Sequence, residues 1–127
     1  MVSFEAFRAV DGTPVYLQII NFIKRGAIAG MIRDGDELPS RRVLSALLGI
    51  NPNTVQKAFH LLEEEHLMES RTGAKSYMTL PPDILDALRR EVLSDELRTM
   101  ARTLRQLGIS RDEALRLIEQ AWEEEAE

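Results

Sequence analysis

The sequence predicts a mostly α-helical fold with one small β-hairpin, divided into an N-terminal domain over residues 1–80 and a two-helix region over residues 81–127. The first observation behind this prediction is that apolar residues recur at helical spacing in five segments. The second is a change of pattern after Leu67, where two short strand-like runs flank a turn that contains Gly73. The third is Pro81-Pro82, a stiff dipeptide that marks the boundary between the two parts.

The first helix is expected to begin at Pro14, because proline fits the first turn of a helix and Thr13 can cap it. Its buried face is expected to contain Tyr16, Ile19, Ile20, Ile23 and Ala27. Gly30 is expected to end this helix, and residues 34–36 (Asp-Gly-Asp) to form a turn.

Two shorter helices are expected next. Ser40 can cap the first of them, which runs to about Leu48 and ends at Gly49. Its side chains expected to face inward are Val43, Leu44, Leu47 and Leu48. Asn51-Pro52 combines a good cap with a good first residue and begins the second helix, whose expected buried stripe is Val55, Ala58, Phe59 and Leu62. Two helices joined by a tight turn match the helix-turn-helix layout.

The residues after these helices predict a β-hairpin. Residues 67–71 and 76–80 are expected to pair as strands, with residues 72–75 as the turn. A hairpin that directly follows the second helix of a helix-turn-helix motif is a wing. Arg71 and Lys75 are then expected at or near its tip.

The region after Pro81 contains two further helical patterns. Gly108 separates them, and Ser110 and Glu113 have the spacing of a capping box at the start of the second. We expect these helices to form a dimerisation region, because two helices in one protomer cannot cover all of their apolar surface. The residues expected at the dimer interface are Leu85, Leu88, Val92, Leu97, Met100, Leu104, Leu107, Ile118 and Trp122.

Composition excludes several classes of protein. The chain has no cysteine, which rules out a disulfide scaffold, a cysteine-ligated zinc finger and a cysteine nucleophile. His60 and His66 lack the spacing of metal ligands, and no catalytic motif is found, so we expect no metal, no cofactor and no enzymatic activity. Charges interrupt every apolar run before the ~20 residues of a membrane helix, and no secretory signal is visible. We therefore expect a cytoplasmic protein with no membrane partner.

The net charge of −5 is distributed unevenly. Residues 1–80 are balanced, whereas residues 81–127 carry the whole acidic excess. Residues 41–60 contain Arg41, Arg42 and Lys57 and no acidic residue. An acidic chain is a poor general binder of polyanions, but this acid-free window can bind phosphate locally.

A series of landmarks spans about half of the chain: Gln18, Gly30, residues 35–42 (Gly-Asp-Glu-Leu-Pro-Ser-Arg-Arg), Asn53-Thr54-Val55, Ala58, Leu62-Glu63 and residues 73–77 (Gly-Ala-Lys-Ser-Tyr). In this order and spacing they resemble the N-terminal winged-helix domain of the GntR family of bacterial transcription regulators. Residues 51–55 (Asn-Pro-Asn-Thr-Val) and the short tail are most similar to the YtrA-type subgroup, whose tail is two helices.

Four residues depart from the family pattern. The family usually has Glu where this chain has Arg41, Arg where it has Pro52, and glycine where it has His66 and Lys75. The changes at Arg41 and His66 leave the predicted fold intact.

The resemblance implies a winged helix-turn-helix domain that binds double-stranded DNA, because the N-terminal residues of its second helix reach base edges in the major groove. The residues expected to contact DNA are Arg41, Arg42, Asn51, Asn53, Thr54, Gln56, Lys57, Arg71, Gly73 and Lys75. The expected function is that of a homodimeric repressor that binds an inverted-repeat operator. A winged helix for protein interaction or nucleoid structuring, without operator specificity, stays open as the alternative, and any small-molecule effector is unknown.

Overall fold

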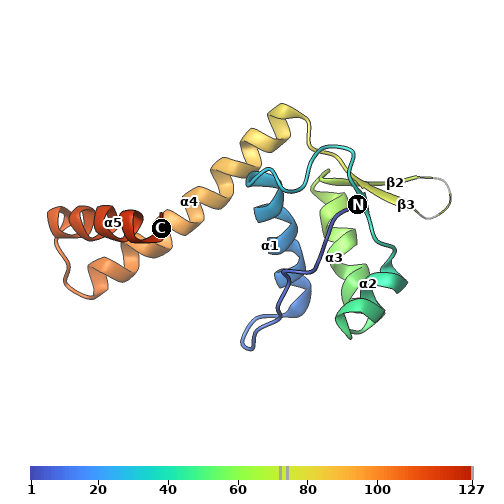
Figure 1. Ribbon diagram of the computed structural model, residues 1–127, viewed down its shortest axis with the longest axis horizontal. Coiled ribbons are helices and arrows are strands. Elements are labelled where there is room, and N and C mark those ends of the chain that lie inside the picture. Colours follow the sequence, from blue (N-terminus) through green and yellow to red (C-terminus); the bar gives the residue numbers. More distant parts are fainter. Residues whose placement is uncertain (72, 74, 127) are drawn as a thin grey trace. The chain divides into compact units, whose positions relative to one another are not determined.

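The computed structural model describes residues 1–71, 73 and 75–126, and Figure 1 shows its course. The chain divides into an N-terminal unit, Met1–Arg89, and a C-terminal unit, Arg90–Glu127. The N-terminal unit contains three helices and a small sheet, and it extends past the expected boundary at residue 80. Helix α4 begins in this unit and continues into the other. The predicted mostly helical fold with a small hairpin is confirmed.

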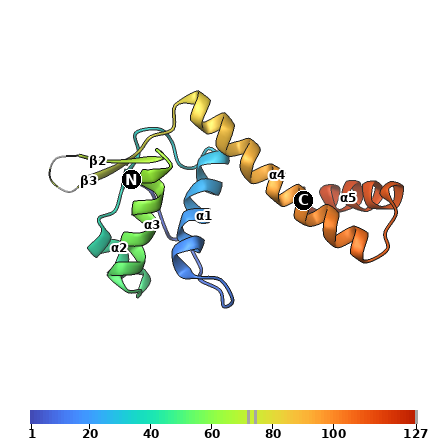
Figure 2. The same cartoon turned by 180° about the vertical axis from the view of Figure 1, so that it is seen from behind.

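Helices α1 (Val15–Ile28) and α3 (Pro52–Glu64) form the centre of the N-terminal unit. They pack against each other, and Figures 1 and 2 show them side by side from both directions. Their buried side chains are the predicted ones: Ile19, Ile20, Ile23 and Ala27 from α1, and Val55, Ala58, Phe59 and Leu62 from α3. The period of apolar residues therefore gave the correct phase of both helices.

Helix α2 (Arg41–Leu48) packs against α3, and the connection between them is tight. Gly49 has a left-handed backbone (φ 66°), which glycine adopts without a steric penalty. The Ser45 hydroxyl donates a hydrogen bond to the carbonyl oxygen of Ile50 (2.5 Å), which fastens the end of α2 to the turn. This turn fixes where α3 begins relative to α2.

The expectation that Val43 and Leu47 face inward is wrong. These residues are 53% and 66% exposed, whereas Leu44 is fully buried. The buried stripe of α2 passes through Leu44 and Ser45, and Val43 and Leu47 lie four residues apart on the flank beside it.

Three antiparallel strands form the sheet in the order β1-β3-β2. Strands β2 (Met68–Arg71) and β3 (Lys75–Met78) are the predicted hairpin, although Lys75 already belongs to a strand rather than to the turn. Arg71 lies opposite Lys75 in the register. Strand β1 (Glu37–Leu38) was not predicted, because two residues are too few to show an alternating pattern.

The N-terminal segment belongs to the core, which the sequence did not predict. Val2, Phe4 and Phe7 are buried, and the backbone N–H of Val2 donates to the carbonyl oxygen of Glu37 (2.8 Å). The ring of Phe4 stacks on Phe22 of α1 with centroids 5.2 Å apart, and Phe7 meets Phe22 edge-on at 5.5 Å. These three aromatic rings thus form a cluster that packs on one side of α1.

Helices α4 (Pro82–Gln106) and α5 (Arg111–Glu125) follow. The Ser110 hydroxyl accepts a hydrogen bond from the backbone N–H of Glu113 (3.2 Å), as the predicted cap requires. Among the described residues, none of the helices has the apolar stretch that a membrane span requires.

Candidate nucleic-acid interface

The start of α3 is shaped by Asn51 and Pro52. The Asn51 side-chain oxygen accepts a hydrogen bond from the backbone N–H of Asn53 (2.8 Å) and caps the helix. Pro52 occupies the first helical position, where its missing N–H costs no hydrogen bond. Asn51 therefore has a defined structural role, and its oxygen is already engaged in the cap.

The next residues of α3 present polar side chains to solvent. Asn53, Gln56 and Lys57 are exposed, and Thr54 is half-buried. Val55 and Phe59 lie in the core on the opposite side of the helix. This exposure pattern agrees with the predicted orientation, in which the short polar groups at the start of α3 remain available to a partner.

Arg41 and Arg42 lie in the first turn of α2 and are both exposed. The guanidinium of Arg41 donates a hydrogen bond to the side-chain oxygen of Gln56, and this contact joins α2 to α3. Across the part of the chain that the structure describes, Arg42 makes no hydrogen bond or ion pair. Its charge is therefore available to an anion.

The electrostatics of both helix starts favour an anion. The first turns of α2 and α3 contain no acidic residue, so the positive ends of their dipoles are not offset by a carboxylate. Backbone N–H groups at such ends bind phosphate oxygens well.

Lys57 has a contact that the sequence did not reveal. Its ammonium group lies 4.1 Å from the centroid of the Tyr16 ring of α1, a cation–π arrangement. This contact holds the cation beside α1 while the residue stays exposed. Tyr16 was predicted as part of the buried face of α1 and is half-buried.

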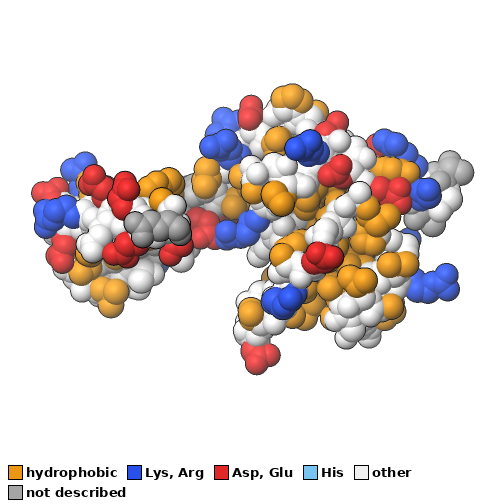
Figure 3. All heavy atoms as spheres, viewed as in Figure 1, with side chains coloured by type: hydrophobic (Ala, Val, Ile, Leu, Met, Phe, Trp, Pro, Cys, Tyr) orange, Lys and Arg blue, Asp and Glu red, His pale blue; other side chains and the backbone are white. Residues whose placement is uncertain are grey.

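The hairpin adds two further cations. Arg71 is ion-paired with Glu69 (2.6 Å), and its guanidinium carbon lies 4.2 Å from the centroid of the Tyr77 ring. Both Arg71 and Lys75, which lies on the facing strand, are exposed. Gly73 is exposed and has a positive φ of 86°, which suits a tight turn. The other turn residues, 72 and 74, lie outside the described part of the chain. In Figure 3 blue Lys and Arg side chains lie along the edge of this unit that carries the hairpin and α2.

The residues predicted to form a dimer interface have different environments. Leu88 is buried within the N-terminal unit, with 4% of its surface exposed. The expectation that Leu88 contacts a second copy is therefore wrong. Leu85, Val92 and Leu104 are half-buried. The remaining predicted residues are exposed: Leu97, Met100, Leu107, Ile118 and Trp122.

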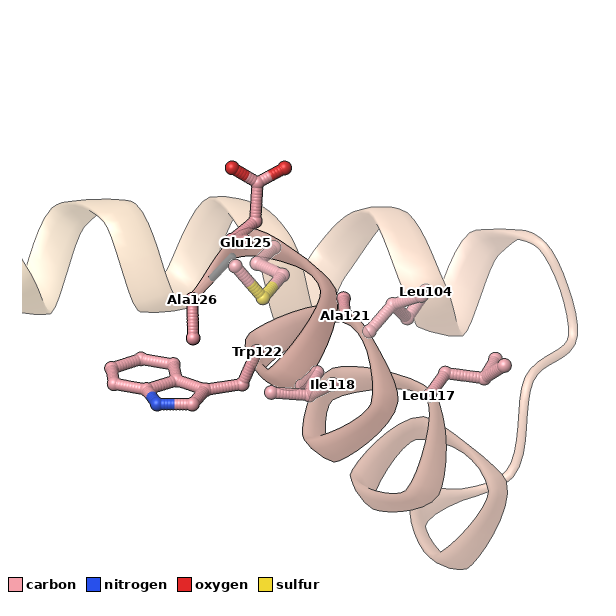
Figure 4. Close-up of a pocket in the computed structure, with 8 residues that line it drawn as sticks. Leu104, Leu117, Ile118, Ala121, Trp122, Glu125 and Ala126 are labelled. Atoms are coloured by element: carbon pink, nitrogen blue, oxygen red, sulfur yellow. The ribbon is translucent and has the colours of Figure 1, made fainter.

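The C-terminal unit has two apolar grooves that share Met100, Leu104 and Ile118. One, of about 630 Å³, is drawn in Figure 4, where Trp122, Ile118 and Ala126 lie on one side of α5. The other, of about 730 Å³, extends toward the connection at Gly108. Trp122 is 75% exposed despite its large apolar ring.

Other exposed apolar residues of the C-terminal unit were absent from the predicted interface: Leu93, Leu115 and Leu117. They flank the predicted stripe, so a wider apolar arc on each helix would have included them. The described residues contain no group of His, Asp and Glu side chains able to hold a metal ion.

Comparison with known proteins agrees with this geometry. Residues 15–77 match the sequence profile of the family described as bacterial regulatory proteins, gntR family. The HTH-type transcriptional repressor YtrA of Bacillus subtilis is 42% identical over 69 residues, which are 54% of this chain and 53% of that protein. The uncharacterized HTH-type transcriptional regulator YhcF of Bacillus subtilis is 28% identical over 102 residues, or 80% of this chain and 84% of that protein.

A solved structure extends the similarity beyond the matched domain. A GntR family transcriptional regulator from Listeria monocytogenes superposes with a TM-score of 0.81 at 26% identity, over 88% of this chain and 98% of that one. These similar proteins are described as transcription regulators rather than enzymes. The chain therefore belongs to the GntR family of bacterial transcription regulators, is of the YtrA type, and carries the family's DNA-binding helix-turn-helix in residues 15–77.

Proposed function

We propose that this chain is a homodimeric repressor that binds an inverted-repeat operator through the starts of α2 and α3 and through the hairpin. The observation that carries the proposal is the surface at the two helix starts. It presents exposed cations and short polar side chains, and residues 41–60 contain no acid to repel phosphate.

In this proposal α3 enters the major groove. A helix with side chains is about 10–12 Å across and fits a groove about 12 Å wide. Asn53, Thr54 and Gln56 then face bases or phosphates, because amide and hydroxyl groups can pair with either. The cap role of Asn51 limits its contribution to its free amide N–H groups.

In this proposal the cations around α3 make different contacts with DNA. Arg42 has a free guanidinium that can bind phosphate or guanine, and in this proposal the exposed Lys57 and Lys75 bind phosphates. Arg71 is ion-paired with Glu69, and this pairing reduces the positive charge that Arg71 offers to DNA. Because the whole chain carries a net charge of −5, binding is expected to depend on this local surface.

The dimer is inferred from the apolar surface of the C-terminal unit. Met100, Leu104 and Ile118 line both grooves, and Leu97, Leu107 and Trp122 are exposed. Apolar surface of this extent on a charged chain marks an interaction site. A second copy offers the same surface, and a two-fold interface pairs such surfaces with each other.

The proposal includes that the bound dimer represses transcription. Its support is the similarity to YtrA of Bacillus subtilis, which is described as a transcriptional repressor and of which this chain spans about half. A dimer that covers promoter DNA excludes other proteins from it.

Selection of bound duplexes from a random pool tests the proposal. Enrichment of one inverted repeat, with both halves protected from cleavage by the bound protein, is the expected result. Enrichment of a single unrepeated site would contradict the dimeric operator. Uniform binding to all duplexes would instead favour a nucleoid-structuring role, and absence of binding a protein-interaction role.

A further inference from the structure

We infer that Arg41 and Gln56 read one operator base as a pair, and that the pair selects guanine over adenine. This inference rests on the proposed function, because it concerns how the start of α3 reads DNA. Arg41 contributes in two ways, because it engages the oxygen of Gln56 and offers its remaining N–H donors beside it.

The two side chains belong to different helices but meet at the exposed surface. The Arg41 guanidinium Nη1 donates to Gln56 Oε1, across the turn that joins α2 to α3. The turn is held by the cap at Ser40, by the left-handed Gly49 and by the Ser45–Ile50 hydrogen bond. The pair is therefore presented by a fixed backbone rather than by two mobile loops.

The contact changes what Gln56 offers to a base. A glutamine with both ends free reads adenine, because its oxygen accepts from the adenine amino group and its nitrogen donates to N7. In this structure the oxygen already accepts from Arg41. An adenine amino group that approached it would meet the N–H donors and the positive charge of the guanidinium.

Most of the groups that remain available are donors, and the second lone pair of Gln56 Oε1 lies beside the positive charge of the guanidinium. Gln56 keeps two N–H bonds on its nitrogen, and Arg41 keeps the guanidinium N–H bonds that do not reach Gln56. Guanine presents two acceptors, O6 and N7, in the major groove, whereas adenine presents one acceptor beside a donor. A surface with donors and positive charge is therefore complementary to guanine.

Arg42 provides a matched control. It adjoins Arg41 in the same turn of α2 and carries the same charge, and within the described residues it makes no hydrogen bond to Gln56. Removing Arg42 tests the loss of a cation from this surface, whereas removing Arg41 tests the loss of the cation and of the pair.

The experiment is selection from random duplexes with four full-length proteins: the unchanged chain, Gln56→Ala, Arg41→Met and Arg42→Met. The base read by the pair is the position whose preference Gln56→Ala abolishes. At that position we expect the unchanged chain to prefer guanine to adenine by at least about fivefold, the lower range for a good bidentate contact. Circular dichroism of each variant confirms that the fold is retained.

Arg41→Met frees the oxygen of Gln56, so the preference at this position is expected to shift toward adenine. Arg42→Met is expected to weaken binding while the guanine preference at this position persists. An adenine preference in the unchanged chain, or a guanine preference that survives Arg41→Met, would contradict the inference that Arg41 and Gln56 read guanine together. Neither result would contradict the proposed binding to an operator. If the unchanged chain enriches no sequence, the proposed operator specificity fails, and the pair fails with it.

Discussion

The side-chain amide of Gln18 is hydrogen-bonded to both backbone groups of Val10. Its oxygen accepts from the Val10 N–H (2.9 Å), and its nitrogen donates to the carbonyl oxygens of Val10 (2.9 Å) and Thr13 (2.7 Å). One residue of α1 thus holds the loop that leads from the N-terminal segment into the helix. Gln18 is also one of the landmarks of the family resemblance, and in this structure its contacts are structural ones.

Replacing Gln18 with alanine removes these three hydrogen bonds. The loss is expected to lower the free energy of unfolding by about 1–2 kcal/mol, because exposed hydrogen bonds contribute modestly. Chemical denaturation measures the change. Asn21→Ala, at an exposed position of the same helix, is the control and should have little effect. Equal stability of the two variants would show that the clamp contributes nothing.

Arg42→Ala is expected to weaken operator binding by about 1–3 kcal/mol, since it removes a free cation from the surface at the start of α2. Titration of one duplex at fixed salt measures the affinity. Arg102→Ala in α4 removes the same charge from an exposed site outside the proposed DNA-contacting surface, and this variant is expected to bind DNA normally. An Arg42→Ala protein with unchanged affinity and an intact fold would remove Arg42 from the DNA surface.

Phe59 and Gln56 are expected to respond to alanine in opposite ways. Phe59 is buried in the core, so Phe59→Ala should destabilise the domain by roughly 3–5 kcal/mol. Gln56 is exposed, so Gln56→Ala should fold normally and bind DNA with weaker or relaxed specificity. Thermal unfolding and DNA titration of both variants separate the two effects. A tolerant Phe59 with a structurally critical Gln56 would reverse the assigned faces of α3.

The buried position of Leu88 predicts where the N-terminal unit can be cut. A fragment of residues 1–89 retains this side chain, whereas a fragment of residues 1–82 loses it together with the half-buried Leu85. Burial of one leucine contributes about 1.5–3 kcal/mol, so the longer fragment should unfold at higher denaturant concentration. Identical unfolding curves would show that Leu88 adds nothing to the core of this unit.

The elements that the sequence predicted well are those defined by local chemistry. Ser40, Asn51 and Ser110 cap helices because their side chains bond to backbone N–H groups within the same turn. The buried faces of α1 and α3 follow from the helical period alone.

The features that the sequence did not predict depend on tertiary packing. Phe4 and Phe7 have no regular spacing, and their burial requires Phe22 on a helix that comes later in the chain. Apolar Val43 and Leu47 fit a helical stripe, but sequence cannot show which flank of α2 another element covers.

The candidate site likewise combines features of local and of tertiary origin. The exposed positions of α3 could be predicted from its period. The contact of Arg41 with Gln56 could not, because it depends on the angle between α2 and α3. The position of Lys57 over the Tyr16 ring likewise depends on how α1 packs against α3.

The central claim is that two chains bind one inverted-repeat operator through a dimer formed by the C-terminal unit. Sedimentation of the full chain with an operator duplex tests it most directly, together with Ile118→Glu and the control Glu119→Gln. The unchanged chain and the control should be dimers at micromolar concentration and bind as two chains to half-sites about 34–36 Å apart. Ile118→Glu places a carboxylate in both apolar grooves, so it should be monomeric and bind the full operator much more weakly. A full chain that is monomeric at this concentration and binds as one chain per duplex, or an Ile118→Glu protein that remains dimeric, would contradict the account.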